Sequence, residues 1–242
     1  MDLSGKVALV TGGARRVGRA ISLAFAHAGA SVIIHHGHSP EEAEATAGEV
    51  RQIGGESQVV RADLSRPEEI EAMFAAVADA PGLLDVLVNN AAVFDPTPLA
   101  ELTAEAWDAQ FAVNARAPAL CIRHALPLLS DGGAVINVVD ISSEQPWPGY
   151  PAYCASKAAL LNLTRSAARA LADRGIRVNA VSPGVAEWAP GTTERQKRTV
   201  LDQVPLGRPG SPTDIASAAV FLAGHDYMTG QNLRVDGGWC VQ

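Results

Sequence analysis

The feature that most limits the fold of this chain is a regular alternation of two kinds of segment. Short runs rich in Val, Ile and Leu cover residues 6–12, 30–36, 57–63, 84–90, 133–139, 175–183 and 231–238. Between them, Ala- and Leu-rich helical patterns begin near Arg15, Pro40, Pro67, Ala104, Tyr153 and Pro212. Strands and helices that alternate in this way form right-handed crossovers and a parallel sheet covered on both faces. We therefore expect an α/β fold, a single doubly wound domain over residues 1–242 with a seven-stranded parallel sheet.

Composition agrees with one large domain and argues against several kinds of partner. Apolar residues make up 48% and charged residues 19% of the 242, which supports a sizeable core and shows no sign of disorder. No apolar run approaches the about 20 residues of a membrane span, and the N-terminal residues do not resemble a signal peptide. A net charge of −7 argues against nucleic acid or an anionic membrane as the main partner. Three scattered cysteines suggest a reducing, cytoplasmic location, and no metal is expected.

A glycine-rich turn follows the first strand-like run. Gly12, Gly13 and Gly18 lie between that run and the first helical pattern. Glycines let the backbone approach a pyrophosphate, and the N-terminus of the helix offers free N–H groups and the positive end of its dipole. Because a strand precedes the turn and a helix follows it, the sequence predicts a dinucleotide-binding Rossmann domain.

The residues around this turn favour NADPH over NADH. Arg16 stands where the usual spacing has another glycine, and Arg15 precedes it. The second strand-like run lacks the carboxylate that binds the adenosine ribose in NAD-dependent proteins, and this stretch carries His36, His38 and Ser39 instead. Since a guanidinium fork suits a 2′-phosphate, we interpret Arg16 as selecting NADPH. The alternative is a solvated arginine, although a cation in the first helical turn opposes the helix dipole.

Two residues suited to proton transfer lie on the helical pattern near residue 153. Tyr153 and Lys157 are four residues apart, so they share one face of a helix. A lysine ammonium beside a phenol stabilises the phenolate and lowers the pKa of the tyrosine. Tyr153 is therefore a candidate proton donor near neutral pH.

Along its whole length the chain resembles the short-chain dehydrogenase/reductase family. The matching pieces are TGGARRVG at 11–18, Asp63, NNAA at 89–92, Asn114 within FAVNARAP, YCASK at 153–157, SPG at 182–184 and VDGG at 235–238. This resemblance implies that Tyr153 donates the proton, that Lys157 also binds the nicotinamide ribose, and that Asn114 holds a water in the proton relay. It also implies a homotetramer, and a tryptophan after VDGG is expected to be buried between subunits.

The same resemblance implies where the cofactor lies. The expected cofactor-binding residues are Gly12, Arg15, Arg16, Val17, Gly18, His36, His38, Ser39, Asp63, Leu64, Asn90, Ala91, Lys157, Pro183 and Gly184.

One residue departs from the family pattern. The family usually has a serine thirteen residues before the tyrosine, where it hydrogen-bonds the substrate carbonyl, and this chain has Asp140. A carboxylate accepts hydrogen bonds when ionised and donates one only when protonated, so Asp140 suits a substrate with N–H donors or a C=N bond that needs a proton. Burial or a nearby like charge would raise its pKa. The alternative is a buried structural aspartate.

Arg16 and Asp140 together resemble one subgroup, the pteridine reductases. The segment NNAAVFDPTPL at 89–99 resembles the one in which their phenylalanine stacks on the pterin, which implies that role for Phe94. The resemblance implies NADPH-dependent hydride transfer to a C=N bond of a dihydropterin or dihydrofolate. The expected substrate-binding residues are Arg16, Phe94, Asp140, Tyr153 and Trp188, with a substrate loop over about 184–210.

Several alternatives stay open at this stage. The chain could reduce a ketone, such as a 3-oxoacyl thioester or a sugar, because one fold hosts many chemistries. A nucleotide sensor without turnover is a third reading. Phe94 is alternatively a core residue, and Trp188 either covers the substrate or packs its own loop.

Overall fold

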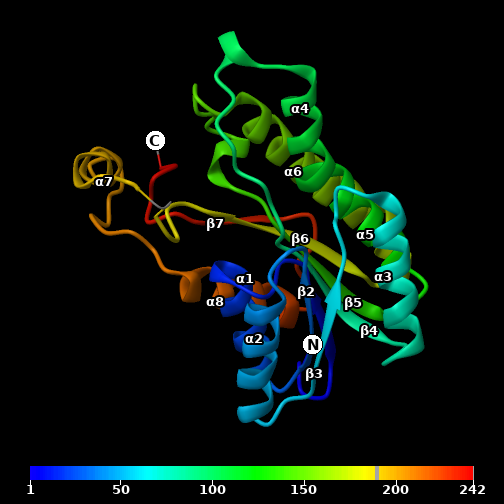
Figure 1. The fold of residues 1–242 in the computed structure, drawn as a ribbon. Coiled ribbons are helices and arrows are strands. Elements are labelled where there is room, and N and C mark those ends of the chain that lie inside the picture. Colours follow the sequence, from blue (N-terminus) through cyan, green and yellow to red (C-terminus); the bar gives the residue numbers. More distant parts are fainter. Residues whose placement is uncertain (189–190, 242) are drawn as a thin grey trace.

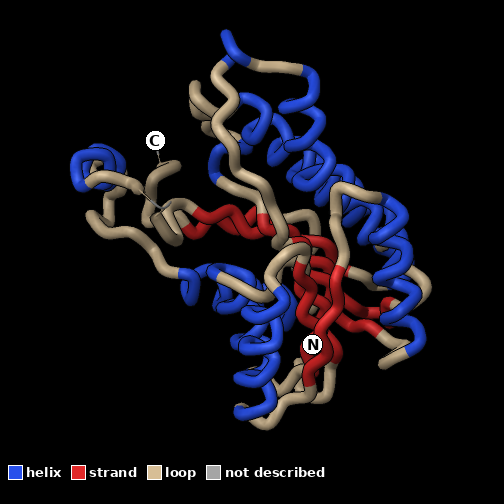
Figure 2. Tube along the Cα trace, viewed as in Figure 1, coloured by secondary structure: helices blue, strands red, loops and turns tan. Residues whose placement is uncertain are grey.

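The computed structural model describes residues 1–188 and 191–241, which form a parallel sheet between two layers of helices (Figures 1 and 2). The strands are β1 (Val7–Val10), β2 (Ser31–His36), β3 (Ser57–Arg61), β4 (Leu84–Asn89), β5 (Leu129–Val138), β6 (Arg177–Pro183) and β7 (Asn232–Val235). Their order is β3-β2-β1-β4-β5-β6-β7, and each neighbouring pair is parallel. The predicted fold class is thereby confirmed.

The helices divide between the two faces of the sheet. They are α1 (Arg16–His27), α2 (Pro40–Gln52), α3 (Pro67–Asp79), α4 (Ala104–Phe111), α5 (Ala117–Ala125), α6 (Pro151–Ala170), α7 (Glu194–Leu201) and α8 (Pro212–Gly224). Helices α1, α2 and α8 cover one face, while α3, α5 and α6 cover the other (Figure 1). None of the helices in the described part of the chain is long and apolar enough to cross a membrane.

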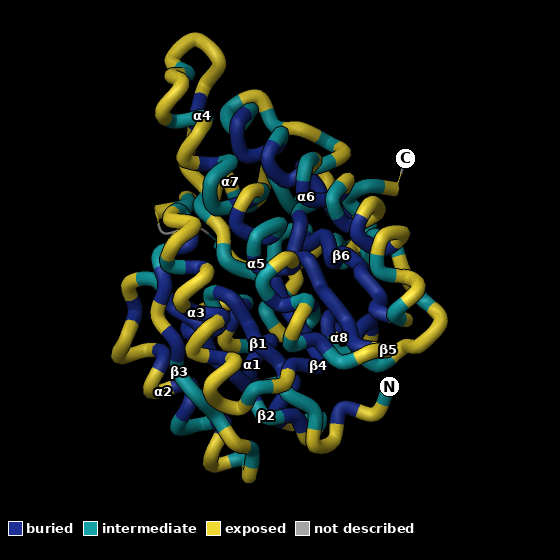
Figure 3. Tube along the Cα trace, turned by 90° about the vertical axis from the view of Figure 1, so that its right-hand side faces the viewer, coloured by how far each residue is buried: buried dark blue, intermediate teal, exposed yellow. Residues whose placement is uncertain are grey.

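The unbroken apolar runs of the sequence reflect burial on both faces of the sheet. Along β1, Leu9 packs under α3 and α5, whereas Val10 packs under α1 and α8, and both are fully buried. Successive side chains of a strand point to opposite faces, so a strand covered on both sides needs apolar residues at every position. The buried strands form the centre of the molecule in Figure 3.

Local signals explain where several helices begin. A proline occupies the first turn of α2, α3, α6 and α8, where its missing N–H costs no hydrogen bond. Helix α8 also has a capping box, in which the Ser211 hydroxyl and the Asp214 carboxylate each accept from the other's backbone N–H.

The region expected as a substrate loop contains a helix that the sequence analysis did not predict. Helix α7 stands away from the sheet (Figure 1) and has no buried residue. Its sequence, ERQKRTVL, is so polar that it lacks the apolar stripe by which a packed helix is recognised. A capping box between Thr193 and Gln196 begins it instead.

The strand order fixes where a ligand can enter. Strand β1 has β2 on one side and β4 on the other, so the chain reverses its direction of progress across the sheet there. The connections after β1 and β4 diverge at this point and leave a crevice at the carboxyl ends of the strands.

Candidate active site

A pocket of about 1070 Å³ runs along the carboxyl ends of the central strands. Its walls come from the turn after β1, the segments after β2 to β6, helix α6, and Trp239 beyond β7. All the residues predicted to bind cofactor or substrate line this pocket. Of the predicted catalytic residues, Asp140, Tyr153 and Lys157 also line it, whereas Asn114 is fully buried behind its wall.

The glycine turn after β1 is closely packed against the segment after β4. Gly12 has a φ of +62°, and a Cβ added at Gly18 would lie 1.9 Å from the Gly12 carbonyl oxygen. The Asn90 side chain donates hydrogen bonds from Nδ2 to the carbonyl oxygens of Thr11, at 2.9 Å, and Gly12, at 3.2 Å. No side chain caps the N-terminus of α1, and its first turn has no acidic residue. Its free N–H groups therefore suit an anionic group such as a pyrophosphate.

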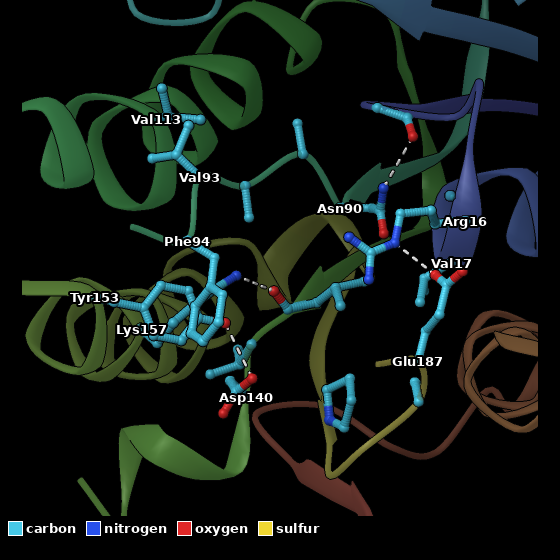
Figure 4. A pocket seen from close by; sticks show the side chains of 18 of the residues that line it. Arg16, Val17, Asn90, Val93, Phe94, Val113, Asp140, Tyr153, Lys157 and Glu187 are labelled. Atoms are coloured by element: carbon cyan, nitrogen blue, oxygen red, sulfur yellow. Dashed lines mark hydrogen bonds and ion pairs between the residues drawn. The ribbon is translucent and has the colours of Figure 1, made fainter. Parts of the chain in front are cut away.

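Arg16 adopts the backbone conformation of the glycine that the usual spacing would place there. Its φ is +52°, in the left-handed region of the backbone that residues other than glycine rarely adopt. Its Nε donates a hydrogen bond to Oε2 of Glu187 at 2.5 Å, and both residues line the pocket (Figure 4). This ion pair joins the turn after β1 to the segment after β6, and the sequence analysis did not identify Glu187.

His35 holds the glycine turn from strand β2. Its Nδ1 accepts a hydrogen bond from the Gly12 N–H at 3.0 Å, and its Nε2 lies 3.0 Å from the Ala62 carbonyl oxygen. Burial lowers the pKa of His35 to about 4, so the ring is neutral at physiological pH. The neutral tautomer with its proton on Nε2 satisfies both contacts.

The end of β2 offers groups for a phosphate. His36 is buried, and its Nδ1 has no hydrogen-bond partner among the described residues. His36, His38 and Ser39 line the pocket together with Arg15. Burial and the charge of Arg61 lower the pKa of His36. An unpaired buried nitrogen beside these polar groups fits a ligand that supplies the missing partner.

The candidate reacting groups lie at the junction of β5 and α6. The Tyr153 hydroxyl donates a hydrogen bond to Oδ2 of Asp140 at 3.0 Å (Figure 4). Oδ1 of Asp140 accepts from the Ser142 N–H at 2.8 Å. Nζ of Lys157 donates to the Val138 carbonyl oxygen at 2.8 Å and lies 5.7 Å from the centre of the Tyr153 ring.

The electrostatics of this group differ from the prediction in one respect. Burial lowers the pKa of Lys157 to about 8, and burial also raises the pKa of Asp140 above its ordinary value. We predicted a lowered pKa for Tyr153, and this was wrong for the group as it stands. Burial and the charge of Asp140 raise the pKa of Tyr153 well above 10. A neutral phenol donating to Asp140 is therefore the stable form.

Asn114 connects the wall of the pocket to the helix that carries Tyr153. It lies in a π-helical segment, Ala112–Arg116, between α4 and α5. Its side chain exchanges two 2.9 Å hydrogen bonds with the backbone of Val93, and its Nδ2 lies 3.1 Å from Oγ of Ser156. π-Helical insertions of this kind often occur at functional sites.

Aromatic rings form part of the pocket wall. Phe94 stacks on Tyr150 at 4.4 Å between ring centres and meets Tyr153 edge-on at 4.7 Å. An exposed fraction of 43% shows that Phe94 is not a core residue. Trp188 is half-buried and also lines the pocket. Residues 189 and 190 of the expected substrate loop lie outside the described residues.

A doubly wound sheet with a dinucleotide-type turn and a buried tyrosine–lysine pair defines a class, the nicotinamide-dependent oxidoreductases of Rossmann type. A family model described as enoyl-(acyl carrier protein) reductase matches residues 12–240. The chain belongs to the short-chain dehydrogenase/reductase family, as the sequence predicted.

Relatives of known activity support this assignment over nearly the whole chain. The 3-oxoacyl-[acyl-carrier-protein] reductase FabG of Staphylococcus aureus is 39% identical over 239 residues, covering 96% of this chain and 97% of that protein. The 2,5-dichloro-2,5-cyclohexadiene-1,4-diol dehydrogenase LinX of Sphingobium indicum is 38% identical over 250 residues, covering 99% and 98%.

Solved structures match equally well. A dehydrogenase/reductase from Sinorhizobium meliloti has a TM-score of 0.94 at 39% identity, with 99% of this chain and 97% of that chain covered. The angucycline C-6 ketoreductase LanV with bound NADP has a TM-score of 0.94 at 33% identity, with 100% and 98% covered. None of these four is named as a pteridine reductase, so the predicted subgroup does not follow from them. The names of FabG and LanV instead agree with the alternative prediction, reduction of a carbonyl group.

Proposed function

We propose that this protein is an NADPH-dependent carbonyl reductase. The observation that carries the proposal is the Tyr153 hydroxyl, which faces the pocket beside Asp140 and shares it with the buried Lys157. The names of FabG and LanV, a 3-oxoacyl reductase and a ketoreductase, support a carbonyl substrate. The NADP bound to LanV supports NADPH as the cofactor of this protein.

The pocket offers groups suited to each part of this cofactor. The uncapped N-terminus of α1 beside Gly12 and Gly18 would hold the pyrophosphate, and His36, His38, Ser39 and Arg15 would surround the 2′-phosphate. Asp63, Leu64, Asn90 and Ala91 would line the adenosine and ribose, and Lys157, Pro183 and Gly184 the nicotinamide end. When bound, NADPH supplies the hydride.

The residues of the chain supply the proton and its orientation. Tyr153 donates its proton to the substrate oxygen as the carbonyl carbon receives hydride, which yields an alcohol. In the structure Asp140 accepts a hydrogen bond through this same proton, so donation to the substrate requires the hydroxyl to turn from Asp140 to the substrate oxygen. Because burial raises the pKa of Asp140, its protonated form is also accessible and would donate a hydrogen bond to a carbonyl oxygen. Asn114 would hold the water that returns a proton to Tyr153.

Asp140 itself favours a second candidate, reduction of a C=N bond in a dihydropterin or dihydrofolate. Its carboxylate would accept a hydrogen bond from the N–H groups of such a ring, whereas a carbonyl oxygen offers none. The exposed Phe94 ring provides a flat surface on which a pterin would stack. Arg16 would bind anionic or acceptor groups in the same pocket.

One assay separates the two candidates. NADPH oxidation is followed at 340 nm with acetoacetyl-CoA, dihydrobiopterin and dihydrofolate, for the wild type, Asp140→Ser and Tyr153→Phe. For a carbonyl reductase we expect turnover of acetoacetyl-CoA that Asp140→Ser keeps or improves. Turnover of a pterin that Asp140→Ser loses would establish the second candidate instead. Tyr153→Phe should abolish either activity, and Asp79→Ser, on the exposed end of α3, is the matched control.

The family resemblance supports three further parts of the proposal. The protein would act as one domain with residues 184–210 as its substrate loop, as a homotetramer, and in the cytoplasm on a small-molecule substrate. Light scattering of the purified protein would test the assembly.

A further inference from the structure

The aromatic wall extends beyond the groups that the reaction needs. From Phe94 the row continues through Tyr150 to Trp147, whose ring centre lies 6.2 Å from that of Tyr150 at an angle of 82°. Trp147 in turn lies 6.3 Å from Trp239 at an angle of 25°, in the range of an offset-stacked pair. Proton transfer by Tyr153 requires none of these rings.

A tight turn aims Trp239 at this row. The Asp236 carboxylate accepts hydrogen bonds from the N–H groups of Gly238, at 3.0 Å, and Cys240, at 2.9 Å. Gly237 and Gly238 have φ values of +65° and +89°, which allow the chain to bend between them. The VDGG motif and its following tryptophan thus build part of the pocket. The sequence analysis assigned this tryptophan to a subunit contact.

Trp147 is fixed by the segment that precedes α6. The Tyr150 N–H donates to the Trp147 carbonyl oxygen at 3.0 Å, which closes the turn that leads into α6. The backbone N–H of Trp147 donates to Sγ of Cys154 at 3.4 Å. Both tryptophans are half-buried and line the same pocket as Tyr153. The pair therefore presents ring surface to the pocket from two segments about 90 residues apart in the chain.

We propose that Trp147 and Trp239 form a substrate subsite that binds a flat ring carried by the substrate beyond the bond that is reduced. The inference rests on the proposed reductase function and narrows it to substrates with an aryl group attached to the reacting part. The wall offers both faces and edges of rings, and these recognise a further ring by stacked or edge-on contact, which a flexible alkyl chain satisfies less well. Asp140 and Tyr153 form the polar end of the pocket, where the bond to be reduced would lie. The aryl ring of the substrate would then extend toward Trp239.

Matched substrate pairs test this subsite in either chemistry. Each pair shares its reacting ring. 4-Phenylcyclohexanone adds a phenyl group to cyclohexanone, and dihydrofolate carries a p-aminobenzoylglutamate group where dihydrobiopterin carries a dihydroxypropyl chain. We expect Trp239→Ala to lower kcat/KM about tenfold for the aryl member through KM, since a well-formed aromatic contact contributes up to about one factor of ten. The shorter member should change less than about twofold, and Trp239→Phe should restore most of the loss.

The control is Trp107→Ala, because Trp107 stacks on Phe111 in α4 at 4.9 Å and does not line the pocket. It should leave the ratio between the two members unchanged. An equal fall for both members in Trp239→Ala would show a purely structural role, and no change in either would show that the ring is not bound there. Both results would overturn the proposal.

Failure of the proposed function is recognised separately. If neither pair is turned over, calorimetric titration of the NADP⁺-loaded protein with dihydrofolate and 4-phenylcyclohexanone still measures the subsite. About tenfold weaker binding of the better ligand to Trp239→Ala would support it. Equal binding to both proteins, or no binding to the wild type, would refute it.

Discussion

Replacing Gly18 by alanine should disturb the glycine turn after β1 more than the same replacement at any other glycine that lines the pocket. The added Cβ would lie 1.9 Å from the Gly12 carbonyl oxygen and 2.6 Å from Nδ2 of Asn90. Ordinary contacts begin near 3.4 Å, so the turn and the Asn90 side chain would both have to move by about 1 Å. The two hydrogen bonds from Asn90 to Thr11 and Gly12 would be stretched or broken.

The magnitude follows from these contacts. Overpacking costs about 1–3 kcal/mol, and each lost hydrogen bond costs about 1 kcal/mol, which gives about 3–5 kcal/mol in the free energy of unfolding. For a chain of this size we expect Tm to fall by about 6–15 °C. Displacing one charge-assisted contact to a phosphate should also weaken NADPH binding by at least about tenfold.

Thermal unfolding and a fluorescence titration with NADPH check both effects. Gly37→Ala is the matched control, because its nearest neighbour would be the Ala62 carbonyl oxygen at 3.7 Å in the same pocket. The control should change Tm by less than about 2 °C. A Gly18→Ala protein that melts and binds NADPH like the control would refute the packing argument.

Three further predictions concern charged groups. Burial lowers the pKa of Lys157 from 10.5 to about 8, so the unfolded chain keeps that proton longer and stability rises between these pH values. Urea unfolding of Lys157→Met should lack this rise, which amounts to about 3 kcal/mol. Burial likewise lowers the pKa of His35 from 6.5 to about 4, so stability is lost as pH falls through this window, and His35→Phe should flatten the acid limb of the unfolding profile by about 3 kcal/mol. Glu187→Gln frees Arg16, and NADPH should bind up to about fivefold tighter at low salt with little difference at high salt.

The features that could be predicted from the sequence depend on local motifs or on the regular spacing of apolar residues. Strands covered on both faces need continuous apolar runs, so β1 to β7 were visible as runs. The glycine turn and the spacing of Tyr153 and Lys157 are local as well. The arginine in place of a glycine at position 16 was visible too, whereas its positive φ was not predicted.

Features that the sequence did not reveal depend on contacts between distant segments. Glu187 meets Arg16 across 171 positions, and Trp239 meets Trp147 only because the turn after β7 folds back over the pocket. The pKa of Tyr153 was predicted in the wrong direction because spacing shows the nearby Lys157 but not the burial of the phenol. The role of His35 was also missed, since a histidine in a strand gives no sign of its acceptor bond to Gly12.

The backbone of Arg16 has a consequence for how this protein can change over time. A residue with a side chain at a φ of +52° costs about 1–2 kcal/mol, whereas glycine adopts it without steric cost. A single substitution of Arg16 by glycine would therefore raise the free energy of unfolding. The same substitution would remove the guanidinium from the wall of the pocket. Selection for heat resistance alone should drive position 16 toward glycine, whereas selection for the ligand binding proposed for Arg16 would hold the arginine in place.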